Sequence, residues 1–236
     1  MNFRHLLMGL LAVSIFACRK PEIKIPVNDN PGLTNINDIS QVYIFMKTTN
    51  GDTVADMHDG QIITTTHWVV HIDRRLRLKN LVVPLQKLYK KRHKKSIHSK
   101  PGTKLYLSHI DSVKGVMALT DFTRMQVKSP FYTSRSYVRR YPAHYRQKNV
   151  LHIDIKPGKI LIDTLSFDFP RSKAAVIEYL YRISKDKKPY EVMLNADYNI
   201  SYERFNDAYS FFALADSTLF RIDPYLFVYN PQDIEP

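Results

Sequence analysis

The chain is poor in cysteine and glycine. Its 236 residues include a single cysteine, Cys18, and seven glycines. One cysteine excludes an intramolecular disulfide, so the fold has to be stabilised by packing. The few glycines form no phosphate-cradling loop, which argues against a nucleotide site. Serines such as Ser108 and Ser201 lack a Gly-x-Ser-x-Gly surround, so the nucleophile elbow of a hydrolase is not indicated.

Acidic residues are also scarce. The chain has 35 Lys and Arg against 22 Asp and Glu, a formal net charge of +13, and residues 87–100 and 131–148 contain no acid at all. This excess favours acidic partners, and the two runs are either a surface that binds anions or a solvated face. The residues predicted to bind an anionic partner are Lys90, Lys91, Arg92, Lys94, Lys95, Arg139, Arg140 and Arg146.

The N-terminal residues predict export and a lipid anchor. Arg4 and His5 precede an apolar run of 12 residues, 6–17, which ends in Ala17 directly before Cys18. The run is shorter than the roughly 20 residues of a membrane-spanning helix, whereas it suits a signal peptide. A small residue before the cysteine is typical of the lipobox of bacterial lipoproteins, so we expect lipidation of Cys18. The alternative is a signal peptide with an incidental cysteine.

These features predict a location and partners. We expect a periplasmic protein, anchored by lipid to the inner or the outer membrane, with anionic lipid headgroups, lipopolysaccharide or peptidoglycan carboxylates as acidic partners. Basic residues interleaved with aromatics in 131–148 are also typical of single-stranded nucleic acid binding. The signal peptide argues against a nucleic acid partner.

Composition and turn signals divide the rest of the chain. We expect a flexible tether, a first module, a basic aromatic connector and a second module, at residues 18–40, 41–130, 131–149 and 150–236. In the first module, Asn50-Gly51 predicts a hairpin turn after an apolar strand. The further elements predicted there are a strand over 61–72, a helix starting near Asn80 with Pro84 in its first turn, a strand over 104–109 and a short helix over 113–119.

The second module has a clearer pattern. Alternating residues around Pro157-Gly158 predict a hairpin, and apolar positions at helical spacing predict a helix over 172–184. A strand follows over 191–196, and Ser201 is a plausible N-cap of a last helix with Tyr202, Phe205, Tyr209 and Phe212 on its inner face. The two halves have a similar order of elements, with Asp111 and Asp197 in equivalent places. This similarity indicates either a duplication or a coincidence, because such α/β units are common.

Residues 150–213 resemble the periplasmic domain of the ExbD/TolR family. The resemblance rests on IDIKPGKILID, a helix, and DKKPYEVMLNADYNISYERFNDAYSFF, in which Ala196-Asp197 lead through Ile200-Ser201-Tyr202 into the last helix. It implies an α+β fold of one or two small modules, each a mixed sheet with helices on one face. Family members also carry a membrane-spanning helix with a proton-transferring aspartate, which this chain lacks. What the resemblance implies is therefore dimerisation and contact with peptidoglycan, envelope proteins, or a motor or transport complex.

Catalytic and metal sites are not indicated. Three histidines, His58, His67 and His71, are predicted to be exposed on strands, where residues four apart lie about 13 Å from each other. No spacing selects a carboxylate pair from Asp154, Asp163, Asp168 and Asp197, and Asp197 suits a turn or helix cap. An enzyme would require Asp154, Asp197, His67 and His71 to converge in a cleft.

The sequence thus predicts a protein with no catalytic residues, no cofactor and no metal. Its predicted role is that of a non-enzymatic, lipid-anchored interaction or scaffold protein of the cell envelope. The alternative is a basic lipoprotein of unrelated fold that binds anionic polymers or lipid headgroups.

Overall fold

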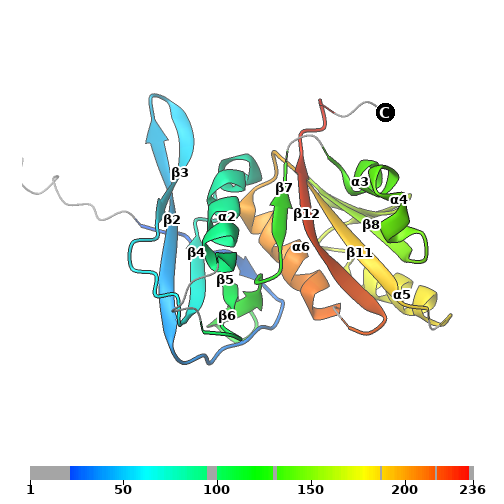
Figure 1. Ribbon diagram of the computed structural model, residues 1–236, viewed down its shortest axis with the longest axis horizontal. Coiled ribbons are helices and arrows are strands. Elements are labelled where there is room, and N and C mark those ends of the chain that lie inside the picture. Colours follow the sequence, from blue (N-terminus) through cyan, green and yellow to red (C-terminus); the bar gives the residue numbers. More distant parts are fainter. Residues whose placement is uncertain (1–21, 95–99, 130–131, 187, 216, 234–236) are drawn as a thin grey trace, which may run out of the picture.

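The computed structural model describes residues 22–94, 100–129, 132–186, 188–215 and 217–233. Within these residues the chain is an α/β protein with two mixed six-stranded sheets and five helices (Figure 1). The predicted signal peptide and Cys18 lie outside the described residues, as does Lys95.

The first sheet has the strand order β1-β5-β4-β2-β3, with β6 on the other edge of β5. Its strands are β1 (Val27–Asn28), β2 (Ile39–Thr49), β3 (Asp52–His58), β4 (His67–Ile72), β5 (Leu105–Asp111) and β6 (Val116–Asp121). The predicted Asn50-Gly51 turn joins β2 to β3, and both residues have positive φ, as a tight hairpin turn requires. Helix α2 (Leu78–His93) connects the parallel strands β4 and β5.

Helix α2 starts two residues earlier than predicted. Its first two N–H groups, of Leu78 and Lys79, donate to the carbonyls of Ile200 and Tyr198, which satisfies donors that a helix start otherwise leaves unpaired. Pro84 therefore lies beyond the first turn, inside the helix, which corrects its predicted place.

The second sheet has the order β10-β9-β8-β11-β12-β7. Its strands are β7 (Gln126–Lys128), β8 (Asn149–Lys156), β9 (Lys159–Ile162), β10 (Leu165–Asp168), β11 (Tyr190–Asp197) and β12 (Phe220–Tyr229). The hairpin, the helix and the strand predicted for 151–196 are confirmed as β8–β9, α5 (Lys173–Ser184) and β11. Helix α6 (Tyr202–Ala215) follows, and the N–H of Arg204 donates to the Ser201 hydroxyl at 3.4 Å, which supports the predicted N-cap.

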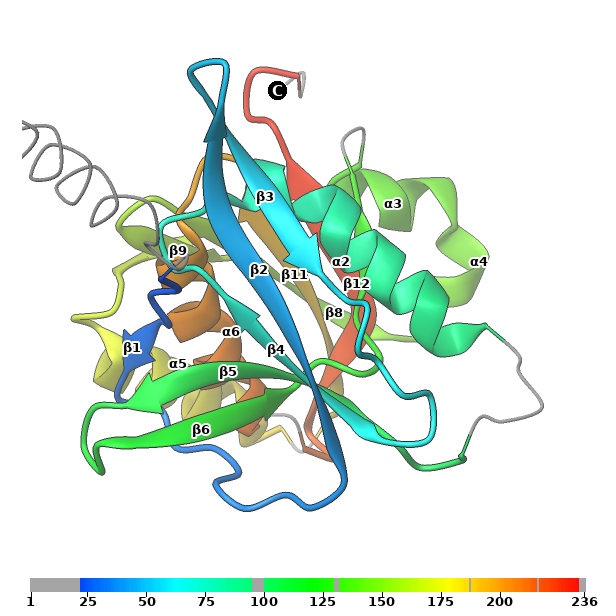
Figure 2. The same ribbon diagram turned by 90° about the vertical axis from the view of Figure 1, so that its left-hand side faces the viewer.

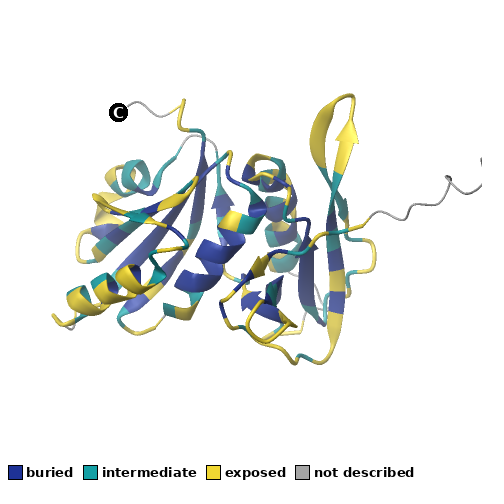
Figure 3. Ribbon diagram, turned by 180° about the vertical axis from the view of Figure 1, so that it is seen from behind, coloured by how far each residue is buried: buried dark blue, intermediate teal, exposed yellow. Residues whose placement is uncertain are grey.

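Helix α6 lies between the two sheets (Figure 1). Its apolar side chains are buried almost all round, and Figure 3 shows this helix as a dark band through the middle of the molecule. The main hydrophobic core contains Val70 of β4, Phe205 of α6 and Leu194 of β11 together. The two halves therefore share one continuous core.

Three parts of the predicted domain organisation are wrong. Residues 22–40 are folded, because β1 pairs with β5 and Asn28 and Asn30 are buried by hydrogen bonds to α6. The predicted connector, as far as it is described, contains α3 (Ser134–Arg140) and α4 (Pro142–Tyr145), whose aromatic residues pack on Met193 and Phe227. Strand β7, placed by sequence in the first module, belongs to the second sheet.

Two predicted features of the sheets are also corrected. The second sheet carries helices on both faces: α5 and α6 cover one, and α3 and α4 cover the other (Figure 1). The short helix predicted over 113–119 is instead a turn followed by β6, because the Asp111 carboxylate accepts the N–H groups of Val113 and Lys114 and reverses the chain there.

The halves share the order of their central strands. The first sheet contains β3-β2-β4-β5 and the second contains β9-β8-β11-β12, each with one antiparallel pairing followed by two parallel pairings. Helix α2 links β4 to β5 as α6 links β11 to β12, whereas α5, between β10 and β11, has no counterpart between β3 and β4. The predicted equivalence of Asp111 and Asp197 is therefore wrong, because Asp73, directly after β4, occupies the place that Asp197 has at the end of β11.

Candidate functional site

The predicted basic residues form two separate groups. Lys90, Lys91, Arg92 and Lys94 lie at the C-terminal end of α2, where positive charge also complements the helix dipole. The second group, Arg139, Arg140 and Arg146, is exposed on and just after α3 and α4. Strands β7 and β12 lie between α2 and these two helices (Figure 1). The two runs therefore do not build one anion-binding surface.

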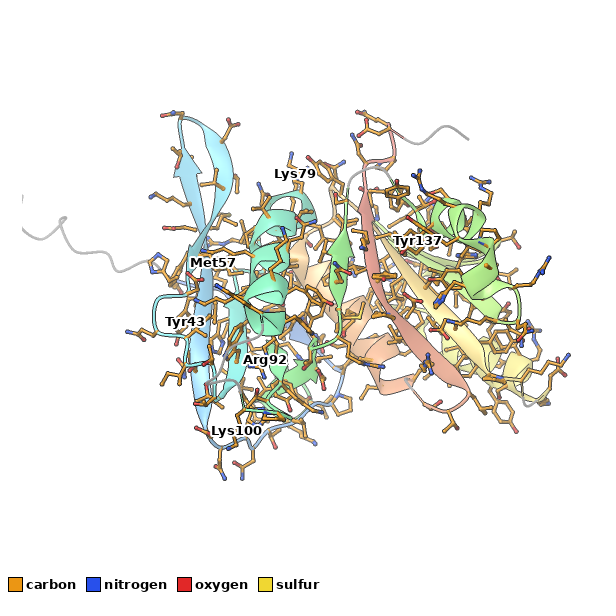
Figure 4. The ribbon with its side chains drawn as sticks, in the orientation of Figure 1. Tyr43, Met57, Lys79, Arg92, Lys100 and Tyr137 are labelled. Atoms are coloured by element: carbon orange, nitrogen blue, oxygen red, sulfur yellow. The ribbon has the colours of Figure 1, made fainter. Side chains whose placement is uncertain are left out.

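Arg92 has a different environment from the lysines beside it. Its guanidinium carbon lies 5.0 Å from the centroid of the Trp68 ring, which is fully buried, and a guanidinium N–H donates to the Thr103 hydroxyl. A hollow of about 250 Å³ opens beside it. We call this hollow the Arg92 pocket, and its lining includes Trp68, Lys91, Arg92, Lys94, Lys100 and Thr103. Figure 4 labels Arg92 and Lys100.

The charge of Arg92 is not neutralised within the described part of the chain. Lys91 pairs with Asp59 at 3.3 Å, and Lys100 with Asp38 at 3.7 Å, whereas no described carboxylate pairs with the Arg92 guanidinium. Burial lowers the pKa of Arg92 below its ordinary value, since desolvation disfavours the charged form. The pocket thus contains a partly desolvated guanidinium with room for an anion beside it.

The three histidines considered as metal ligands remain apart from any ligand set. Strand β4 places His67 and His71 on the face opposite Trp68, and the described residues contain no group of three or more His, Cys, Asp or Glu that could hold a metal ion. The prediction that His71 is exposed is wrong. It is buried at 4% exposure, its Nδ1 lies 2.9 Å from the Ser108 hydroxyl, and its ring stacks on Tyr43.

Burial lowers the pKa of His71 from 6.5 to about 4, so this residue should contribute to acid sensitivity. Between these values the unfolded chain binds a proton that the folded chain excludes. Stability present above pH 6.5 is therefore lost as the pH falls towards 4, by up to about 3 kcal/mol. We expect His71→Gln, which can keep the hydrogen bond to Ser108, to flatten this part of the curve of unfolding free energy against pH, measured by urea denaturation. An unchanged slope would contradict this origin.

The carboxylates and histidines required for an enzyme do not converge. Asp154 lies on β8 and pairs with Arg135 at 2.8 Å, whereas His67 and His71 lie on β4 in the other sheet. The Asp197 carboxylate accepts the N–H of Asn199 at 2.8 Å, which confirms the predicted turn role.

Sequence reasoning did not anticipate a serine–histidine contact in the second half. The Ser134 hydroxyl lies 2.7 Å from His152 Nδ1 and accepts a hydrogen bond from the Asn195 amide at 2.7 Å. Ser134 is completely buried, so its hydroxyl cannot meet a substrate. The contact fixes the start of α3 against β11, and no local sequence pattern signals it because the three residues lie far apart in the chain.

A larger hollow of about 420 Å³ lies between α6, β6 and residues 31–33. Its lining is mostly apolar, and the carboxylate of Asp121 at its edge pairs with Lys104 at 2.9 Å. The Arg92 pocket is therefore the better candidate for recognition of a charged partner.

None of the described helices is long and apolar enough to cross a membrane. Comparison of the chain with protein-family models, with curated proteins and with solved structures found no match in any of the three.

Proposed function

We propose that the protein is a non-enzymatic, lipid-anchored protein of the cell envelope that binds an anionic polymer through the Arg92 pocket. The observation that carries the proposal is the partly buried Arg92 guanidinium, stacked on Trp68 with no described carboxylate partner. A guanidinium presents a planar fork of donors that matches a carboxylate or phosphate, and partial desolvation strengthens such a pair.

The position of the pocket favours a polymer over the headgroups of the anchoring membrane. Trp68 is the second residue of β4, whereas the backbone N–H of Lys24 donates to the carboxylate of Asp73, just beyond the last residue of this strand. Five residues of strand separate these places by roughly 16 Å. The pocket lies away from the attachment point at Lys24, on the α2 side of the sheet, where the carboxylates of peptidoglycan are accessible partners.

The resemblance of residues 150–213 to the ExbD/TolR periplasmic domain supports a scaffold or interaction role of the same kind. That domain acts through contacts with envelope partners, which agrees with the scattered carboxylates and the buried serine of this chain. A homodimer built on this half belongs to the same proposal.

The test is co-sedimentation of the full chain with purified peptidoglycan over a salt series. We expect Arg92→Gln to weaken binding about tenfold, since a hydrogen-bonded charge contributes about 1.5 kcal/mol or more. The matched control is Arg139→Gln, which removes the same charge from the exposed surface of α3 and should change binding less than twofold. Equal effects of the two variants would mean that binding depends on the net charge and not on the pocket, which would contradict the proposal.

A parallel arm uses anionic liposomes. If Arg92→Gln weakens binding to liposomes and leaves peptidoglycan binding unchanged, the ligand of the pocket is a lipid headgroup, and the polymer assignment is wrong. Thermal unfolding of both variants checks that each remains folded.

A further inference from the structure

The chain is fastened to the first sheet from Lys24 onward. The carbonyl of Lys24 accepts the N–H of Arg74 at 2.7 Å, and the carbonyl of Pro26 accepts the N–H of Ile110 at 2.8 Å. Cys18 precedes Lys24 by six residues. An extended chain spans at most about 3.6 Å per residue, so Cys18 and Lys24 are separated by about 20 Å or less. A lipid on Cys18 would therefore hold this side of the protein close to the bilayer.

The surface beside this attachment point is apolar. On the outer face of the first sheet, away from α2, a hollow of about 260 Å³ is lined by residues that include Ile25, Ile36, Ile39, Tyr43, Val69 and Met117. Ile39 and Met117 are 42% and 40% exposed, and Val27 of the adjoining β1 is 42% exposed. Figure 2 looks onto this face, and none of the described helices lies over it.

We propose that this outer face docks on the interfacial region of the bilayer that holds the anchor. The inference rests on the proposed lipid anchor and adds an orientation to it. Ile25 both follows the attachment point and lines the hollow, so the short connection brings the apolar face and the lipid surface together. Because the anchor makes docking intramolecular, a small apolar contact suffices.

A second copy of the chain does not fit between this face and the bilayer. The chain has a helix layer between two sheets, and α3 and α4 form a further layer on the far face of the second sheet. At about 10 Å per packed layer, such a body exceeds the roughly 20 Å that the connection allows. The bilayer is therefore the occupant that the length of the connection favours.

The test places a fluorescent label at one introduced cysteine in the full-length, lipidated chain. The acylated thiol of Cys18 cannot react, so Met117→Cys and Tyr181→Cys each give a single labelling site. Tyr181 is the matched control, because it is 66% exposed on α5, which packs on the second sheet. Vesicles containing lipids with a quencher near the headgroup should quench the label at 117 several-fold more than the label at 181.

Equal quenching at the two positions, or quenching at 181 alone, overturns the docking. A Cys18→Ser variant, expected to stay in solution, separates this result from the anchor itself. If the labelled chain that keeps Cys18 remains on vesicles and its label at 117 is not quenched, the docking is wrong and the anchor is supported. If that chain is released from vesicles like Cys18→Ser, both the anchor and the docking are wrong. Cross-linking between the cysteines at position 117 of two chains would assign this face to contact with a second copy.

Discussion

Replacing Phe205 with alanine is expected to lower the free energy of unfolding by about 3–5 kcal/mol. Phe205 is fully buried in the first turn of α6, its ring centroid 5.7 Å from that of Tyr209, in the core that both sheets share. The cavity would lie in this shared core. We therefore expect hydrogen exchange to accelerate together in β4 of the first sheet and β11 of the second, with a single transition in urea.

The control for this prediction is Leu214→Ala on the same helix. Leu214 is 54% exposed, so its truncation should change stability by no more than about 0.5 kcal/mol. The shared core would be contradicted if Phe205→Ala accelerated exchange in β11 and left β4 protected. That pattern would mean that the halves unfold as separate modules, as the sequence had predicted.

The elements predicted correctly are those that local chemistry determines. Asn50-Gly51 and Pro157-Gly158 give the hairpin turns, because Gly51 and Gly158 adopt the positive φ that such turns require. Helices α5 and α6 follow from apolar spacing, and α6 also from the N-cap Ser201. Each of these signals lies within a few residues of the element that it forms.

The fold of segment 22–40 and the last strand, β12, could not be predicted from such local signals. Asn28 and Asn30 are polar, which favours a tether, yet both are buried because they hydrogen bond to Asn206 and Asp207 of α6. Strand β12 contains Pro224, which cannot donate to a sheet ladder, and it lies where the register with β11 shifts. Both features depend on partners distant in sequence, or on an irregularity that a strand pattern does not contain.

The candidate site shows the same division. The acid-free run identifies a basic end of α2, but it cannot distinguish Arg92 from its neighbours. What sets Arg92 apart is Trp68 on β4 and Thr103 before β5, which α2 and the sheet bring together. The sequence therefore predicts the charge of the site, and only the fold shows which cation lies in a hollow.

A second large effect is expected at Lys173, at the start of α5. Its ammonium group lies 2.7 Å from Asp207 Oδ1 and 3.2 Å from Asn30 Oδ1, and it also contacts Asp29. The side chain of Lys173 is only 15% exposed, and that of Asp207 11%. Asp207→Ala should lower the free energy of unfolding by about 3 kcal/mol, because it leaves a largely buried ammonium without its closest buried counterion and the Asn30 amide without one acceptor.

The other carboxylate on the same ammonium is the matched control. Asp29 is 58% exposed, and although Lys173 lowers its pKa, solvent screens the pair, so Asp29→Ala should cost less than about 1 kcal/mol in urea denaturation. Replacing both buried charges by Lys173→Met with Asp207→Leu should recover part of the loss, because an apolar pair needs no counterion and Met can retain packing on Phe169 and Phe211. If Asp29→Ala and Asp207→Ala cost the same, burial does not determine the strength of this cluster. If the double variant is less stable than Asp207→Ala alone, Lys173 stabilises α5 and residues 28–30 through hydrogen bonds that its aliphatic chain cannot replace.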